Sequence, residues 1–237
     1  MNSVRRSIFF ILGAGASADS GLPTYRGING LYSNVTTPEN ILNPQVLCSE
    51  DGPEKIWNFL RPIYEEIPHQ TPGPTYQKLK ELITKFPDSF LLTQNIDGYA
   101  KSLEIPVVEI HGNWSKMYCL KCRNLYSTNL ENPKCECASW CRPDVVLFGE
   151  NLPVKELTLI FTLIKTCPEY VIIVGTTLQF PYLRILINKA KNRGSKIIHI
   201  NPDEKYSENV TRNEQWIKSS AVEGLDTFNR ELEEYRK

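Results

Sequence analysis

The sequence lacks an excess of either charge, since its 237 residues contain 27 Lys and Arg against 27 Asp and Glu. A face that binds nucleic acid is usually strongly basic, and the pair Arg5–Arg6 is too small to make one. No apolar run approaches the ~20 residues that a helix needs to cross a bilayer. The apolar stretch 8–12 runs directly into a glycine turn, which favours a buried strand over a signal peptide. We therefore expect a cytoplasmic protein that binds neither nucleic acid nor membranes.

The seven cysteines are an odd number, and five of them crowd between positions 119 and 141. Crowding with short gaps favours a metal site over disulfides in a reducing cytosol. The crowded cysteines are Cys119, Cys122, Cys135, Cys137 and Cys141. Four thiolates in two closely spaced pairs are typical of a closed structural zinc site. A redox role for the first pair is the alternative, but no thioredoxin-like context accompanies it.

Short apolar runs without strict alternation recur along the chain, as in strands that are buried on both faces. These runs cover residues 8–12, 90–92, 107–110, 145–148, 170–174 and 196–200. Helix-like segments lie between several of them, at 75–86, 154–166, 183–193 and from about Val222 onward. This alternation predicts an α/β protein with a Rossmann-like, doubly wound parallel sheet.

Two segments break the alternation. Residues 32–65 are punctuated by Pro and Asn and then partly helical, and residues 113–143 hold the crowded cysteines. We interpret both as insertions that form one smaller domain, made of a helical segment and a zinc module. The larger, Rossmann-like domain would then comprise residues 1–31, 66–112 and 144–237.

Polar residues follow the apolar runs directly. They are Gly13-Ala14-Gly15, Thr93-Gln94-Asn95-Ile96-Asp97, His111-Gly112, Gly149-Glu150, Gly175-Thr176-Thr177 and Asn201. In a parallel α/β sheet the carboxyl ends of the strands line one crevice, where ligands bind. The sequence therefore predicts that these six groups converge on one edge of the sheet.

The first of these groups matches a dinucleotide-binding turn. Gly13-x-Gly15-x-x-Ala18 follows a predicted strand, and its glycines allow a tight turn and a close approach to a pyrophosphate. The acidic residue expected about 20 positions later in a dehydrogenase is missing from its usual place. A dinucleotide site of another kind is the better interpretation.

The motifs together resemble the sirtuin family. The stretches "GAGASADSGLPTYRG", "TQNIDG", "EIHGNW", a CxxC, "RPDVVLFGE" and "GTTL" occur in this order across residues 8–201. The resemblance implies NAD-dependent removal of acyl groups from protein lysines, with transfer of the acyl group to ADP-ribose and release of nicotinamide. It also implies a Rossmann-like domain, a small zinc-bearing domain and a cleft between them.

The same resemblance implies roles for individual residues. The turn residues Gly13, Ala14, Gly15 and Ala18 would bind the pyrophosphate, and Tyr25 with Arg26 would lie in a loop over the ribose. Gln94, Asn95 and Asp97 would shape the nicotinamide pocket, while Gly175, Thr176, Thr177 and Asn201 would hold the adenosine side. A surface salt bridge for Arg26, and an internal loop network for the residues of 94–97, are the structural alternatives.

His111 is the predicted catalytic residue. Histidine titrates near neutral pH, so it can accept a proton from a ribose hydroxyl under cellular conditions. By the resemblance, His111 would activate the 2′-hydroxyl through the neighbouring 3′-hydroxyl. His69 and His199 have no comparable context, and we expect no catalytic role for them.

Resemblance also guides the choice of zinc ligands. In the family the last cysteine stands five residues before the arginine of the RPD motif, and Cys137 has this distance from Arg142. We therefore expect the ligands Cys119, Cys122, Cys135 and Cys137, with Cys141 as the alternative to Cys135.

On the substrate side, an acyl-lysine peptide would add as a strand beside residues 148–151, with Val146, Phe148, Gly149 and Glu150 as binding residues. Relatives that prefer acidic acyl groups carry a Tyr-x-x-Arg pair in the small domain. Leu60 and Ile63 align with that pair here, while Arg61 and Tyr64 are out of register. Apolar acyl groups, and acetyl first, are thus expected.

Two rival functions use the same fold. The first is mono-ADP-ribosylation or NAD hydrolysis, which His111 weakens because family members without deacylase activity often lack that histidine. The second is a non-catalytic module that senses NAD or binds a partner, which predicts NAD binding without turnover.

Overall fold

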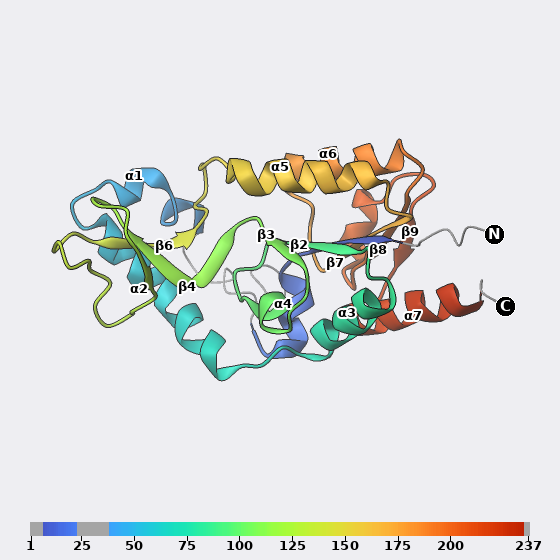
Figure 1. The fold of residues 1–237 in the computed structure, drawn as a ribbon, viewed down its shortest axis with the longest axis horizontal. Coiled ribbons are helices and arrows are strands. Elements are labelled where there is room, and N and C mark those ends of the chain that lie inside the picture. The colour runs from blue at the N-terminus through green and yellow to red at the C-terminus, as the bar shows by residue number, and fades with distance from the viewer. Residues whose placement is uncertain (1–6, 23–37, 235–237) are drawn as a thin grey trace.

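A computed structural model describes residues 7–22 and 38–234 and places a parallel sheet at the centre of the larger lobe (Figure 1). Its strands are β1 (Ile8–Leu12), β2 (Phe90–Thr93), β3 (Val107–Glu109), β7 (Tyr170–Val174), β8 (Lys196–Ile200) and β9 (Gln215–Ile217). They lie in the order β3-β2-β1-β7-β8-β9, and every neighbouring pair is parallel. Chain order reverses between β1 and β7, so this is the point at which a doubly wound sheet opens a crevice.

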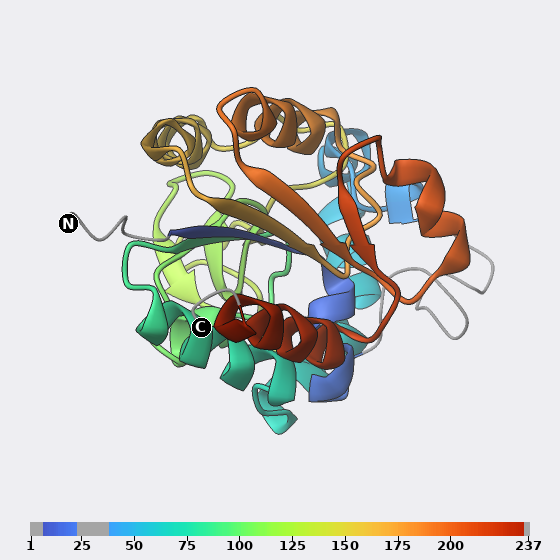
Figure 2. The same cartoon turned by 90° about the vertical axis from the view of Figure 1, so that its right-hand side faces the viewer.

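Helices cover both faces of this sheet, as Figure 2 shows. The helices α3 (Pro74–Lys85) and α7 (Ala221–Glu234) pack on one face, and α5 (Val154–Leu163) and α6 (Pro181–Lys191) on the other. Alternate residues of β1 serve the two faces, since Phe10 belongs to the first core and Phe9 to the second. Burial on both faces explains why the strands are continuous apolar runs.

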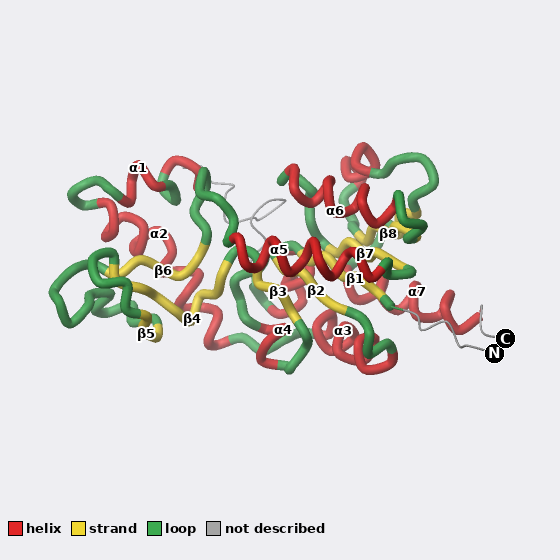
Figure 3. Tube along the Cα trace, turned by 45° about the horizontal axis from the view of Figure 1, so that its top comes forward, coloured by secondary structure: helices red, strands yellow, loops and turns green. Residues whose placement is uncertain are grey.

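The chain builds a smaller lobe at one end of the molecule (Figure 3). An antiparallel sheet of β5 (Leu125–Ser127), β4 (Gly112–Cys119) and β6 (Cys141–Val145) packs against α2 (Gly52–Glu66). Trp57 on α2 donates its indole N–H to the carbonyl of Cys141 at 2.7 Å. The architecture is therefore a Rossmann-like sheet with a smaller lobe inserted, as the sequence predicted.

Shorter elements complete the fold. They are α1 (Pro44–Leu47), α4 (Tyr99–Ser102) and the 3₁₀ helices η1 (Ala14–Ser20), η2 (Pro38–Asn40), η3 (Ile67–His69), η4 (Ile164–Thr166) and η5 (Glu204–Asn209). Asn43 caps α1 by accepting a hydrogen bond from the N–H of Val46 at 2.9 Å. Within the described ranges, no helix is both long and apolar enough to cross a membrane.

One predicted strand is wrong. Residues 145–148 were expected to join the parallel sheet, but only Val145 is in a strand, and that strand, β6, pairs antiparallel with β4. The N–H of Phe148 donates instead to the carbonyl of Leu42 at 2.7 Å. Consequently Gly149 and Glu150 do not follow a strand of the large sheet, and five of the six polar groups, rather than six, lie at its carboxyl edge.

Candidate functional site

The glycine turn after β1 is packed directly against the end of β7. The N–H of Gly13 donates to Val174 O at 3.0 Å, and the N–H of Gly15 donates to Gly175 O at 2.9 Å. A Cβ atom on Gly15 would lie 2.7 Å from the Cα of Gly175, which is too close for any side chain. The close packing of this turn against Gly175 therefore requires glycine at position 15, whether or not a phosphate binds here. Gly13 is the N-cap of the 3₁₀ helix η1, and Gly15 already lies in its first turn.

A buried hydrogen-bond network lies beneath this turn. Asn95 donates from Nδ2 to Gly13 O at 3.0 Å and to Ser17 Oγ at 2.9 Å. Asp97 accepts from Ser17 Oγ at 2.6 Å and from the hydroxyl of Tyr76 at 3.0 Å. Burial raises the pKa of Asp97, and the hydrogen bonds that it accepts oppose this rise. The internal network predicted as the alternative for this loop is thus present, and it fixes the loop against the turn.

His111 lies between β3 and β4, at the same edge of the sheet. Its Nδ1 is 3.0 Å from the carbonyl oxygen of Gln94. A carbonyl only accepts, so Nδ1 carries the proton and Nε2 keeps its lone pair. Burial lowers the pKa of His111, and the Gln94 carbonyl partly offsets this effect. The imidazole is therefore neutral at pH 7, with Nε2 able to accept a proton.

The opposite side of the crevice is built by the ends of β7 and β8. Gln94, in the loop after β2, donates from Nε2 to Thr176 Oγ1 at 2.9 Å, which links that loop to the segment after β7. Asn201 reaches Thr176 O from Nδ2 at 3.5 Å, and its own carbonyl accepts from the indole of Trp216 at 3.0 Å. These contacts place the predicted pyrophosphate, nicotinamide and adenosine groups along one continuous edge.

Four cysteines of the small lobe form a cluster. The Sγ atoms of Cys119, Cys122, Cys135 and Cys137 all lie within 4.8 Å of one another. A tetrahedron with Zn–S bonds of about 2.3 Å has sulfur–sulfur edges of roughly 3.8 Å, and two Sγ pairs here are 3.5 and 3.4 Å apart. Backbone N–H groups of Lys121 and Cys122 point at Cys119 Sγ. The donor set fits one zinc ion, and Cys141 is not part of it.

Comparison with known proteins agrees with this geometry. The sequence model of the Sir2 family matches residues 13–181. The chain belongs to the Sir2 family. It is 33% identical to the NAD-dependent protein deacylase of Aquifex aeolicus over 205 residues, which cover 84% of each chain. It is 34% identical to NAD-dependent protein deacylase 2 of Pseudomonas syringae over 211 residues, covering 83% of this chain and 84% of that one.

Solved Sir2 structures resemble the whole chain. A Sir2 homologue in complex with NAD has a TM-score of 0.82 and 30% identity, covering 98% of this chain and 91% of that one. A triple mutant of Sir2 homologues bound to 2′-O-acetyl ADP ribose has a TM-score of 0.84, again at 30% identity, covering 97% and 92%. The sirtuin resemblance read from the motifs is therefore confirmed.

Several of the residues predicted to bind the peptide form hydrogen bonds or ion pairs within the protein. The N–H of Val146 donates to His111 O at 2.9 Å, which ties the segment to the loop of the predicted base. Glu150 forms an ion pair with Arg142, 2.8 Å from Nη2, and accepts from the N–H of Leu147 at 2.8 Å. Gly149 has φ +84°, with open space around it. The charge of Glu150 is thus already paired with Arg142.

Some predicted site residues have no described contact at the crevice. Tyr25 and Arg26 lie outside the described residues. Ala18 and Thr177 are exposed. Conversely, no motif assigned a role to Ser17, Tyr76 or Tyr182, whose side chains contact Asp97, Asn95 or His111. Ser17 is inside the quoted glycine motif, whereas the tyrosines stand in helices with no local signal.

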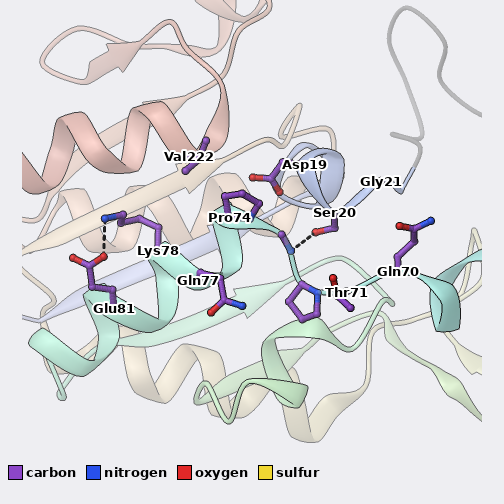
Figure 4. A pocket seen from close by; sticks show the side chains of 12 residues that line it. Asp19, Ser20, Gly21, Gln70, Thr71, Pro74, Gln77, Lys78, Glu81 and Val222 are labelled. Atoms are coloured by element: carbon purple, nitrogen blue, oxygen red, sulfur yellow. Dashed lines mark hydrogen bonds and ion pairs between the residues drawn. The ribbon is translucent and has the colours of Figure 1, made fainter.

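One surface hollow lies away from this crevice. Figure 4 shows it, with a volume of about 710 Å³, between η1, the loop before α3 and the start of α7. Asp19 there accepts from the N–H and hydroxyl of Thr75 at 2.8 and 2.7 Å. Lys78 is paired with Glu81 and with Asp226. Asp19 and Lys78 are thus engaged by neighbouring residues of the hollow's rim.

Proposed function

We propose that the protein is an NAD-dependent protein lysine deacylase that transfers the acyl group to ADP-ribose. The observation that carries this proposal is the state of His111 at the carboxyl edge of the sheet. Its Nδ1 is fixed by the carbonyl of Gln94, and its Nε2 is left as a neutral proton acceptor. The family relatives named as NAD-dependent protein deacylases support the reaction class.

NAD would supply an electrophilic ribose carbon. The bond from this carbon to nicotinamide would break, and the acyl oxygen of the lysine substrate would add to the carbon. The protein residues bind, orient and move protons. His111 Nε2 would accept a proton from a ribose hydroxyl, and a base with a pKa close to or below neutral is suited to this task. Gln94 keeps the imidazole in the required tautomer throughout.

The residues of the crevice would share the dinucleotide. We assign Gly13, Ala14, Gly15 and Ala18 to the pyrophosphate, and Asn95 and Asp97 with Gln94 to the nicotinamide pocket. Gly175, Thr176, Thr177 and Asn201 would hold the adenosine side, and Tyr25 with Arg26 the ribose. The lobe of residues 1–31, 66–112 and 144–237 would thus bind NAD, and the lobe of 32–65 and 113–143 would complete the cleft.

An acyl-lysine peptide would lie along the segment after β6. We assign Val146, Phe148 and Gly149 to this strand-like contact, in which backbone hydrogen bonds give affinity and little sequence selectivity. Glu150 would contribute indirectly: its ion pair with Arg142 would hold the turn before Glu150 in place.

One zinc ion would have a structural role. Cys119, Cys122, Cys135 and Cys137 supply four thiolates, a closed set that leaves no position for a substrate. Reduced thiolates are also consistent with a cytoplasmic location, which we propose together with the absence of nucleic-acid and membrane partners.

The test is to incubate the protein with NAD and a panel of acyl-lysine peptides. Equal amounts of nicotinamide and deacylated peptide are expected. Nicotinamide without deacylated peptide would favour NAD hydrolysis or ADP-ribosyl transfer, and the ADP-ribosylated protein would be visible by mass. Binding of NAD without any nicotinamide would favour a sensing module.

A further inference from the structure

The side chain of Tyr182 faces His111 from the first turn of α6. Its hydroxyl lies 3.5 Å from Nε2 of His111, and the two ring centroids are 6.4 Å apart. Phe180, just before α6, places its ring edge-to-face with the imidazole at 5.3 Å. The imidazole is therefore contacted at both nitrogens, at Nδ1 by Gln94 O and at Nε2 by Tyr182.

The direction of the second contact follows from the first. Because Nδ1 donates to a carbonyl, Nε2 of the neutral ring holds a lone pair, and the phenol must be the donor. A protonated imidazolium has no lone pair at Nε2. A protonated ring would instead donate from Nε2 to the phenol oxygen, so Tyr182 is the donor only when the ring is neutral.

Charged groups on the neighbouring elements are engaged elsewhere. Glu109 on β3 accepts from Asn113 Nδ2 at 2.6 Å. Asp97 accepts from Ser17 and from the tyrosine of α3. On α6, burial raises the pKa of Tyr182 well above its usual value, so the phenol keeps its proton and can donate at neutral pH.

We propose that Tyr182 is a positioning residue for His111, donating a hydrogen bond to Nε2 until a substrate hydroxyl replaces it. The replacement step rests on the proposed function, since the arriving donor would be a ribose hydroxyl of NAD. At 3.5 Å the contact is long for an O–H···N bond, which makes it weak and easily exchanged. The tyrosine hydroxyl thus occupies the direction from which the substrate proton must come.

The test uses Tyr182→Phe, which removes the hydroxyl and keeps the ring. Because the phenol oxygen accepts a stronger, charge-assisted bond from the protonated ring, loss of the hydroxyl should lower the pKa of His111 by about 0.5 to 1 pH unit. NMR titration of the imidazole C–H signals measures this without turnover, and His111→Asn assigns the signal among only three histidines. The matched control is Tyr206→Phe, which removes a hydroxyl 2.9 Å from Nδ1 of His199 and should leave the titration of His111 unchanged.

The same shift should appear in catalysis. The acid limb of kcat/KM for an acetyl-lysine peptide should move to lower pH by a similar amount in Tyr182→Phe. An unchanged His111 titration together with an unchanged acid limb would overturn the proposal, as would a loss of rate that is equal at every pH. If Tyr182→Phe still lowers the pKa of His111 in a protein that shows no deacylase activity, the proposed function is refuted and the positioning contact is supported.

Discussion

Arg61 donates from Nη2 to the backbone carbonyl of Leu130 at 2.8 Å, which turns its guanidinium toward the small lobe's loop. Leu60 and Ile63 lie on the same helix and are buried in the apolar core. They align with the residues that bind the acyl carboxylate in other family members. The guanidinium of Arg61 is therefore already bonded to a carbonyl, and the two aligned positions offer only hydrocarbon side chains.

Acetyl-lysine peptides should consequently be used better than succinyl-lysine peptides. An unpaired carboxylate in an apolar pocket is costly, so kcat/KM should favour acetyl by on the order of tenfold or more. The measurement compares both peptides side by side in the wild type and in Arg61→Met, which should keep the same preference. A succinyl preference that disappears in Arg61→Met would mean that Arg61 reads the carboxylate.

His111→Ala should reduce deacylation by about 10²–10⁴-fold, the usual loss for a general base. Thermal unfolding and NAD binding should remain close to wild type, since the ring is half-buried and its main bond is to one carbonyl. Because burial lowers the pKa of His111 below 6.5, the wild-type rate should fall only as the pH drops below that value. Near-normal turnover by the variant would contradict the assignment.

Purified protein should contain about one zinc ion per chain, and a strong chelator should lower its melting temperature, because a structural metal stabilises the fold directly. Metal analysis that finds no zinc, or stoichiometric iron, would refute the site. Cys135→Ser should lose the metal, whereas Cys141→Ser should retain it, since Cys141 lies outside the thiolate cluster. The reverse pattern would show that Cys141 is the fourth ligand.

The loss of folding stability at acid pH should depend on Glu214. Burial alone would raise the pKa of this carboxyl, but hydrogen bonds from Lys191 and Thr211 prevail and lower it to about 2. A lowered folded-state pKa contributes stability above pH ~4.5 that is lost as the pH falls toward 2. The contribution is on the order of 1–3 kcal/mol.

Unfolding measured by denaturant between pH 2 and 6 tests this. Glu214→Gln should be less stable than wild type near neutral pH and should show a flatter acid dependence, while Glu208→Gln at an exposed position serves as control. Equal pH dependence in wild type and Glu214→Gln would contradict the role of this carboxylate.

Much of this arrangement could be predicted from the sequence because it depends on local patterns. The strands 8–12, 170–174 and 196–200 are apolar runs buried on both faces, and they have the predicted bounds. Cysteine spacing likewise anticipated the cluster that the structure brings together. The glycine turn and His111 share one edge because parallel strands end there.

The errors and omissions have a tertiary cause. The run 145–148 has the composition of a central strand, yet only Val145 pairs, with β4 of the small sheet, and the N–H of Phe148 bonds to Leu42; no local pattern indicates either partner. The contact of Ser17 with Asp97 joins residues 80 positions apart, and that of Tyr182 with His111 joins residues 71 apart. No repeating sequence pattern indicates which distant residue a short polar side chain or a helical tyrosine will contact.

The packing of α2 on β6 also orders events during synthesis. The helix ends at Glu66 and the strand begins at Cys141, so about 75 residues must be added before the partner exists. At ~5–20 residues per second this takes about 4–15 s. The part of α2 that packs on β6, with Trp57, therefore lacks this partner until Cys135 and Cys137 have also been made. Closure of the small lobe and capture of its metal thus become possible at nearly the same moment of translation.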